Sequence, residues 1–105
     1  VLTIEYFVTN SDELLLNELA PRFHNSGHLT IEAFNISQFE NHVRAVCSLK
    51  SKPIEKISNA EMYNILGFEI QNYKKKTFKK NEFFHDYLKT DVKENRKMGH
   101  LTELL

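Results

Sequence analysis

The spacing of apolar and polar residues changes several times along this chain, and each change marks a different predicted element. Residues 1–9 are rich in β-branched and aromatic side chains, which is typical of a strand. The turn-forming cluster Thr9–Asp12 follows, and a second apolar run occupies Leu14–Leu16. This order predicts a β-hairpin with a two-residue turn at Ser11 and Asp12.

The middle of the chain predicts a loop followed by a helix. Residues 19–30 show neither helical nor strand periodicity, and Pro21 and Gly27 interrupt them, so we expect a loop. Ser37 followed three residues later by Glu40 is the signature of a capping box. Apolar residues then recur at helical spacing, which predicts a helix over about residues 35–48.

The second half reads as short apolar segments separated by polar links. Ala60–Leu66 is apolar, and residues 71–82 carry most of the lysines and are expected to form a solvated face. Phe83–Leu88 and Met98–Leu101 are predicted strands. The resulting class is α+β, with a mainly antiparallel sheet, a β-hairpin and one main helix.

Composition excludes several kinds of protein. Fourteen basic and fourteen acidic residues cancel, so the chain lacks the surplus of cations that a general nucleic-acid binder needs. Its single cysteine, Cys47, excludes a disulfide framework and a cysteine-based zinc site, and is typical of a reducing compartment. No apolar run approaches the roughly 20 residues of a membrane span, so we expect no membrane segment.

The predicted hairpin carries the first candidate for chemistry. A two-residue turn pairs Phe7 with Leu16 and Glu5 with Glu18, and like charges directly opposite each other are destabilising. A divalent cation would remove that penalty, and two carboxylates beside Asn17 form an oxygen-rich site that suits magnesium better than zinc. The alternative is a register shifted by one residue, with both acids exposed to solvent.

Two further segments carry candidate anion sites. The loop Arg22–His28 combines a guanidinium, an imidazole, an amide, a hydroxyl and a glycine, which favours an anion-binding loop over a zinc site. Alternatively, Arg22–His28 is a polar surface loop without a ligand. Arg96 and Lys97 stand before an apolar residue and Gly99, so they either present a phosphate site or end a strand in solvent.

Several of these segments, in this order, resemble the 5-(carboxyamino)imidazole ribonucleotide synthases, a family of ATP-grasp ligases. Asn-Glu-Leu-Ala-Pro-Arg combined with His-Asn-Ser-Gly-His is the most specific part of the resemblance. Residues 48–95 match only in general pattern. The matching blocks are Ile4–Thr9, Leu16–Arg22, His24–His28, Thr30–Ala33, Ser37–Glu40, His42–Ala45 and Arg96–Thr102.

The resemblance implies an organisation and an activity. Residues 1–105 would be the C-terminal portion of the ligase, with 1–48 in the metal- and nucleotide-binding half of the ATP-grasp domain and 49–105 in a small β-rich part. The family uses ATP, magnesium and bicarbonate to carboxylate aminoimidazole ribonucleotide in cytoplasmic purine biosynthesis, with carboxyphosphate as intermediate. Expected partners are these small molecules, the rest of the ligase and a second copy in a homodimer. We expect no activity from this chain alone.

The resemblance also implies roles for individual residues. Phe23 stands where the family usually has proline, and Asp91–Asn95 lacks the Pro-Gly turn often found before the Arg-Lys pair. Two alternatives stay open: another ATP-grasp ligase of the same pathway, such as a formate-using transformylase, or a non-catalytic module that binds a phosphate or a partner. The implied roles are metal binding by Glu5 and Glu18, ATP binding by Asn17 and Glu18, catalysis by Arg22, His24 and Lys97, and substrate binding by Asn25, Ser26, Arg96 and Lys97.

Overall fold

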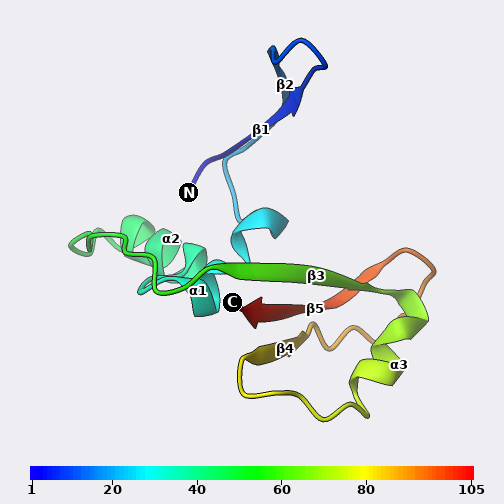
Figure 1. The fold of residues 1–105 in the computed structure, drawn as a ribbon. Coiled ribbons are helices and arrows are strands. Elements are labelled where there is room, and N and C mark those ends of the chain that lie inside the picture. Colours follow the sequence, from blue (N-terminus) through cyan, green and yellow to red (C-terminus); the bar gives the residue numbers. More distant parts are fainter.

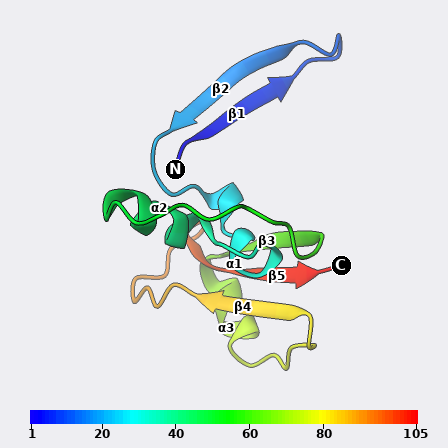
Figure 2. The same ribbon diagram turned by 90° about the vertical axis from the view of Figure 1, so that its left-hand side faces the viewer.

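A computed structural model describes all residues, Val1–Leu105, and contains two separate antiparallel sheets. Strands β1 (Thr3–Val8) and β2 (Leu14–Ala20) form a hairpin that projects away from the rest of the molecule, as both views in Figures 1 and 2 show. The hairpin and the antiparallel pairing confirm the predicted α+β class.

The second sheet has three strands in the order β3-β5-β4. These are β3 (Ala60–Leu66), β4 (Glu82–Asp86) and β5 (Lys97–Leu104), and β5 lies in the centre. All three lie near the predicted apolar segments. The strand β5 is longer than predicted because its two neighbours pair with it as far as Glu103 and Leu104.

The hairpin pairs Glu5 with Glu18, as predicted, but the rest of the predicted register is wrong. Beyond Glu5 the register shifts by one residue, so that Phe7 lies opposite Leu15 instead of Leu16. The cause is a longer turn over residues 9–13, closed by a 3.0 Å hydrogen bond from the Thr9 amide to the Glu13 carbonyl. A bulge at Asn17 absorbs the extra residue and restores the pairing of the acids.

Short helices connect the two sheets. The predicted loop 19–30 begins as the end of β2 and contains a turn of 3-10 helix, η1 (Asn25–Gly27), and the first residue of α1 (Thr30–Ala33). The main helix, α2, spans Gln38–Val46 and is shorter than predicted. No helix in the structure combines the length and apolar character that a membrane crossing needs.

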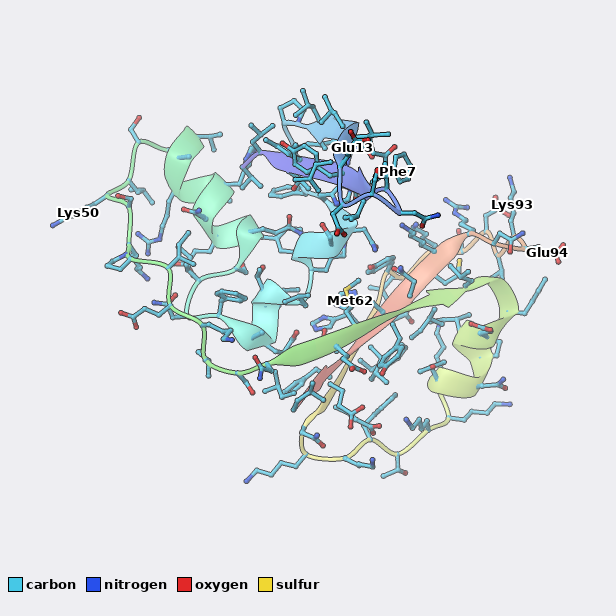
Figure 3. All side chains as sticks on the ribbon, turned by 45° about the horizontal axis from the view of Figure 1, so that its top comes forward. Phe7, Glu13, Lys50, Met62, Lys93 and Glu94 are labelled. Atoms are coloured by element: carbon cyan, nitrogen blue, oxygen red, sulfur yellow. The ribbon has the colours of Figure 1, made fainter.

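Only half of the predicted capping box forms at the start of α2. The Ser37 hydroxyl accepts a 3.1 Å hydrogen bond from the Glu40 amide, as predicted. The Glu40 carboxylate does not reach back to Ser37, because it pairs with Arg44 at 2.8 Å and Lys52 at 3.0 Å. Figure 3 shows Lys50 projecting beyond the end of this helix.

The apolar core lies between the three-stranded sheet and the segment formed by η2 (Gly67–Glu69) and α3 (Ile70–Tyr73). Only 12 of 105 residues are buried, and none of the hairpin's large apolar side chains is among them. Figure 3 shows one of these, Phe7, on the projecting hairpin. The hairpin therefore depends on its own pairing within this chain. The core consists of Ile65, Ile70, Met98 and Leu101, with Tyr73, Phe78, Phe84 and Val92 packed around it.

A buried polar layer connects α1 to the sheet. The Glu32 carboxylate lies 2.6 Å from Nε2 of His85, and the His85 ring stacks on His100 with centroids 4.4 Å apart. The Tyr87 hydroxyl bonds to Nδ1 of His100 at 2.9 Å, and the His28 ring lies 5.4 Å from the same imidazole. His100 is thus enclosed by His85 of β4, by Tyr87, which follows β4, and by His28, which follows η1.

This layer predicts a loss of stability in acid. Burial, together with the nearby His85 and His28, lowers the pKa of His100 from 6.5 to about 4. The unfolded chain therefore takes up a proton there as the pH falls below 6.5, whereas the folded chain resists it until about pH 4. In that window this residue reduces the free energy of unfolding, by at most about 1.4 kcal/mol per pH unit.

The measurement is denaturant unfolding of the complete protein from pH 7 to pH 4.5, compared with a His100→Phe variant. The variant should depend less steeply on pH than the wild type. Equal pH dependence in the two proteins would contradict this origin for the acid sensitivity.

Candidate metal and anion site

The acid pair of the hairpin forms the centre of the site. Glu5 of β1 and Glu18 of β2 lie opposite each other, and His24 follows a few residues after β2 ends. Nε2 of His24 is 3.3 Å from a Glu5 carboxylate oxygen and 3.7 Å from a Glu18 carboxylate oxygen. One ligand atom from each of the three residues lies within 4.8 Å of the other two.

The bulge at Asn17 brings a third hairpin side chain to the acids. In a regular strand Asn17 and Glu18 would point to opposite faces. The bulge removes that alternation, and the Asn17 amide donates a 3.3 Å hydrogen bond to Glu5. Both acids and the amide predicted for metal and ATP binding therefore lie together.

Ser26 orients the imidazole of His24. The Ser26 backbone N–H donates to Nδ1 of His24 at 3.3 Å, and the Ser26 hydroxyl lies 2.8 Å from the same nitrogen. A backbone N–H only donates, so Nδ1 accepts, and the neutral imidazole carries its proton on Nε2. His24 therefore presents an N–H to the two carboxylates, and its side chain is only 11% exposed.

Arg22 brings an exposed positive charge to the same edge. One of its terminal nitrogens lies 3.0 Å from Glu18, and the other donates to the Phe23 carbonyl at 3.0 Å. The side chain is 64% exposed, and exposed pairs of this kind contribute little stability. The guanidinium can therefore exchange Glu18 for another anion at small cost.

The C-terminal cations occupy two different positions. Burial first, and then Lys97 and the neighbouring His24 and His85, lower the pKa of His28, while the His24 main chain raises it. Lys97 therefore acts electrostatically on the same loop. Arg96 instead donates to the Asp91 carbonyl at 2.9 Å and to its carboxylate at 3.2 Å. The turn that holds Asp91 also contains Lys93 and Glu94, which are labelled in Figure 3.

The structure gathers most of the predicted site residues, but not all of them. Arg96 pairs with Asp91 and makes no hydrogen bond to Asn25 or Ser26, which are also predicted to bind substrate. Asn25 lies in η1, where its carbonyl accepts the His28 amide at 3.1 Å. The gathered residues are Glu5, Asn17, Glu18, Arg22, His24 and Ser26.

Sequence reasoning missed Gln38, whose side chain binds the loop that carries His24 and His28. This side chain is buried and bonds to the main chain of His24 and to the ring of His28. A polar residue directly after the helix cap is ordinarily exposed. The only signal for Gln38 in the sequence is that it lies within one of the blocks resembling the ATP-grasp ligases.

Two family models match this chain in different parts. A model of the ATP-grasp domain matches residues 1–39, and a model described as the phosphoribosylaminoimidazole carboxylase C-terminal domain matches residues 60–104. Among curated relatives, the N5-carboxyaminoimidazole ribonucleotide synthase of Bacillus subtilis is 43% identical over 102 residues, and that of Brucella melitensis is 42% identical over 104 residues. These alignments cover 96% and 99% of this chain but only 27% and 29% of the relatives.

Solved structures agree with these matches. N5-carboxyaminoimidazole synthetase from Staphylococcus aureus superposes with a TM-score of 0.86 at 39% identity, over 99% of this chain and 29% of that one. The Aspergillus clavatus synthase complexed with ATP gives 0.88 at 36% identity, over 97% and 28%. The A. clavatus enzyme in complex with ADP and 5-aminoimidazole ribonucleotide gives 0.86 at 36%, over 97% and 29%.

Residues 1–39, which contain the hairpin and its acid pair, are thus similar to the ATP-grasp domain. The chain is similar, over nearly its whole length, to the N5-carboxyaminoimidazole ribonucleotide synthases. This similarity confirms the resemblance found in the sequence. The chain spans less than a third of the length of these relatives.

Proposed function

We propose that these residues belong to an ATP-grasp ligase that carboxylates the amine of 5-aminoimidazole ribonucleotide with bicarbonate, using ATP and passing through carboxyphosphate. The observation that carries the proposal is the acid pair of Glu5 and Glu18 facing the donors of Arg22 and His24. Similar structures hold ATP, ADP and aminoimidazole ribonucleotide, which supports this function over a formate-using ligase.

The acids fit magnesium. Carboxylate oxygens are its preferred protein ligands, whereas the Nε2 proton of His24 leaves no lone pair there for a metal. Glu5 and Glu18 would therefore hold the ion, with Asn17 positioning Glu5 and facing ATP. Magnesium, when bound, supplies positive charge that neutralises the β- and γ-phosphate oxygens of ATP.

The adjacent cations fit the oxyanions of the reaction. Arg22 can bind bicarbonate or carboxyphosphate through two parallel N–H groups, and His24 donates from Nε2 beside it. Lys97 adds a positive charge on the side of His28. By holding carboxyphosphate out of water, these groups favour its breakdown to phosphate and carbon dioxide beside the substrate amine, which then attacks the carbon dioxide.

We assign the phosphate of the ribonucleotide to Asn25, Ser26 and Arg96. Asn25 offers a side-chain amide with no partner within the chain, and Ser26 offers a hydroxyl that already orients His24. Arg96 is only paired with an exposed acid, Asp91, so the cost of transferring its guanidinium to a phosphate is small.

The first test removes one charge from the acid pair. In the complete protein, Glu18→Gln should lower kcat by about 10²-fold or more, because the phosphate charge is then less well compensated. The magnesium concentration for half-maximal rate should rise in the same variant. Steady-state kinetics over a magnesium series measures both.

Glu13→Gln is the matched control, since it removes an exposed acid from the same hairpin at a distance from the pair. Its rate and magnesium dependence should equal those of the wild type. The assignment is wrong if Glu18→Gln behaves like this control.

The second test separates ATP cleavage from carboxylation. Arg22→Ala and Lys97→Ala should reduce formation of the carboxylated product about tenfold or more while ATP still binds, because the anion is held less firmly. Phosphate release and carboxylated product are measured in parallel on each variant. Lys80→Ala, an exposed lysine of the solvated segment, is the control. Control-like rates for both products in both variants would show that Arg22 and Lys97 are surface residues.

A further inference from the structure

Gln38, the first residue of α2, makes three side-chain hydrogen bonds to the loop that carries His24. Its Oε1 accepts the His24 amide at 3.0 Å, and its Nε2 donates to the His24 carbonyl at 2.8 Å. The same Nε2 lies 2.7 Å from Nδ1 of His28. Gln38 is only 8% exposed, so these bonds are shielded from competition by water.

The main chain of His24 determines which way the Gln38 amide faces. A backbone N–H only donates and a carbonyl only accepts, so Oε1 must face the first and Nε2 the second. The amide nitrogen that faces His28 is therefore a donor, and Nδ1 of His28 must accept. A neutral His28 consequently carries its proton on Nε2.

A charged His28 does not fit this arrangement. Protonated Nδ1 would direct its hydrogen at the NH₂ group of Gln38, and the positive ring would face the charge of Lys97. A hydrogen bond to the His24 main chain raises the pKa of His28, but burial and then Lys97, His24 and His85 lower it more, and this net direction agrees with the geometry. A neutral His28 leaves the charge of Lys97 available to an anion.

The space around the Gln38 amide is closed by Gly27. A Cβ atom added at Gly27 would lie 2.6 Å from Oε1 and 2.8 Å from Cδ of Gln38, so any larger residue must displace the amide. Thr30 adds a further connection, since its hydroxyl accepts the Gln38 backbone amide at 2.9 Å and donates to the Gly27 carbonyl at 2.5 Å. The loop and the start of α2 are thus joined at several points.

We propose that Gln38 is a positioning residue whose amide fixes the main chain of His24 and holds His28 neutral, with its proton on Nε2. By fixing this main chain, it keeps the His24 imidazole beside the acid pair. The kinetic part of this inference rests on the proposed carboxylating function, whereas the protonation of His28 does not.

The test uses the complete protein labelled with ¹⁵N-histidine. In the wild type, the ring nitrogens of His28 should show an unprotonated Nδ1 and a protonated Nε2 between pH 6 and pH 8. Gln38→Glu places a carboxylate there, which can only accept, so Nδ1 of His28 should become protonated. Gln38→Met removes every side-chain bond and should leave the two neutral forms of His28 in exchange.

Kinetics provides the second measurement. Both Gln38 variants should lower kcat for carboxylation by about tenfold to a hundredfold, with little change in the KM for ATP. Gln71→Met, at an exposed position of α3, should change neither the kinetics nor the His28 signals. A general loss of stability would not by itself change the protonated nitrogen of His28.

Gly27→Ala keeps the Gln38 amide but pushes it away, so it should disturb the His28 signals and lower kcat as well. If Gln38→Met does not fold, the Gly27→Ala and Gln38→Glu variants still test the role of Gln38. Wild-type His28 signals in these variants would overturn the proposal. A wild-type protein that lacks carboxylating activity would overturn the proposed function, while the His28 signals would still decide the role of Gln38.

Discussion

Two negative charges face each other across the β1–β2 hairpin, and the neighbouring residues are arranged to compensate them. Glu5 and Glu18 occupy opposed positions that would repel each other if left alone. The structure surrounds them with donors: His24 faces both, and Arg22 pairs with Glu18. The same requirement for positive charge makes the hairpin a suitable place for magnesium and for the phosphates of ATP.

The compensation depends on residues far from the hairpin in the sequence. His24 reaches the acids because its loop is held by Gln38 at the start of α2. The same glutamine bonds to His28, whose ring packs near His100 of β5. A buried polar connection therefore runs from the acid pair to the three-stranded sheet, although the two sheets share no strand pairing.

The sequence predicts the hairpin, the helix cap and the opposed acids, because each depends on neighbouring residues. The pairing of Glu5 with Glu18 was predicted from a turn that is too short, and it is correct because the bulge at Asn17 offsets the longer turn. The contacts of Gln38, His28 and His100 could not be predicted in this way, because their partners come from elements distant in the sequence. The position of Arg96 against Asp91 likewise depends on how one turn closes.

The central claim is that the hairpin acids form a magnesium site. The most direct measurement is a crystal structure of the complete protein with magnesium and a non-hydrolysable ATP analogue. We expect the metal about 2.1 Å from a carboxylate oxygen of Glu5 and of Glu18, with His24 outside its coordination sphere. A metal held by other residues, with these two carboxylates unligated, would contradict the account.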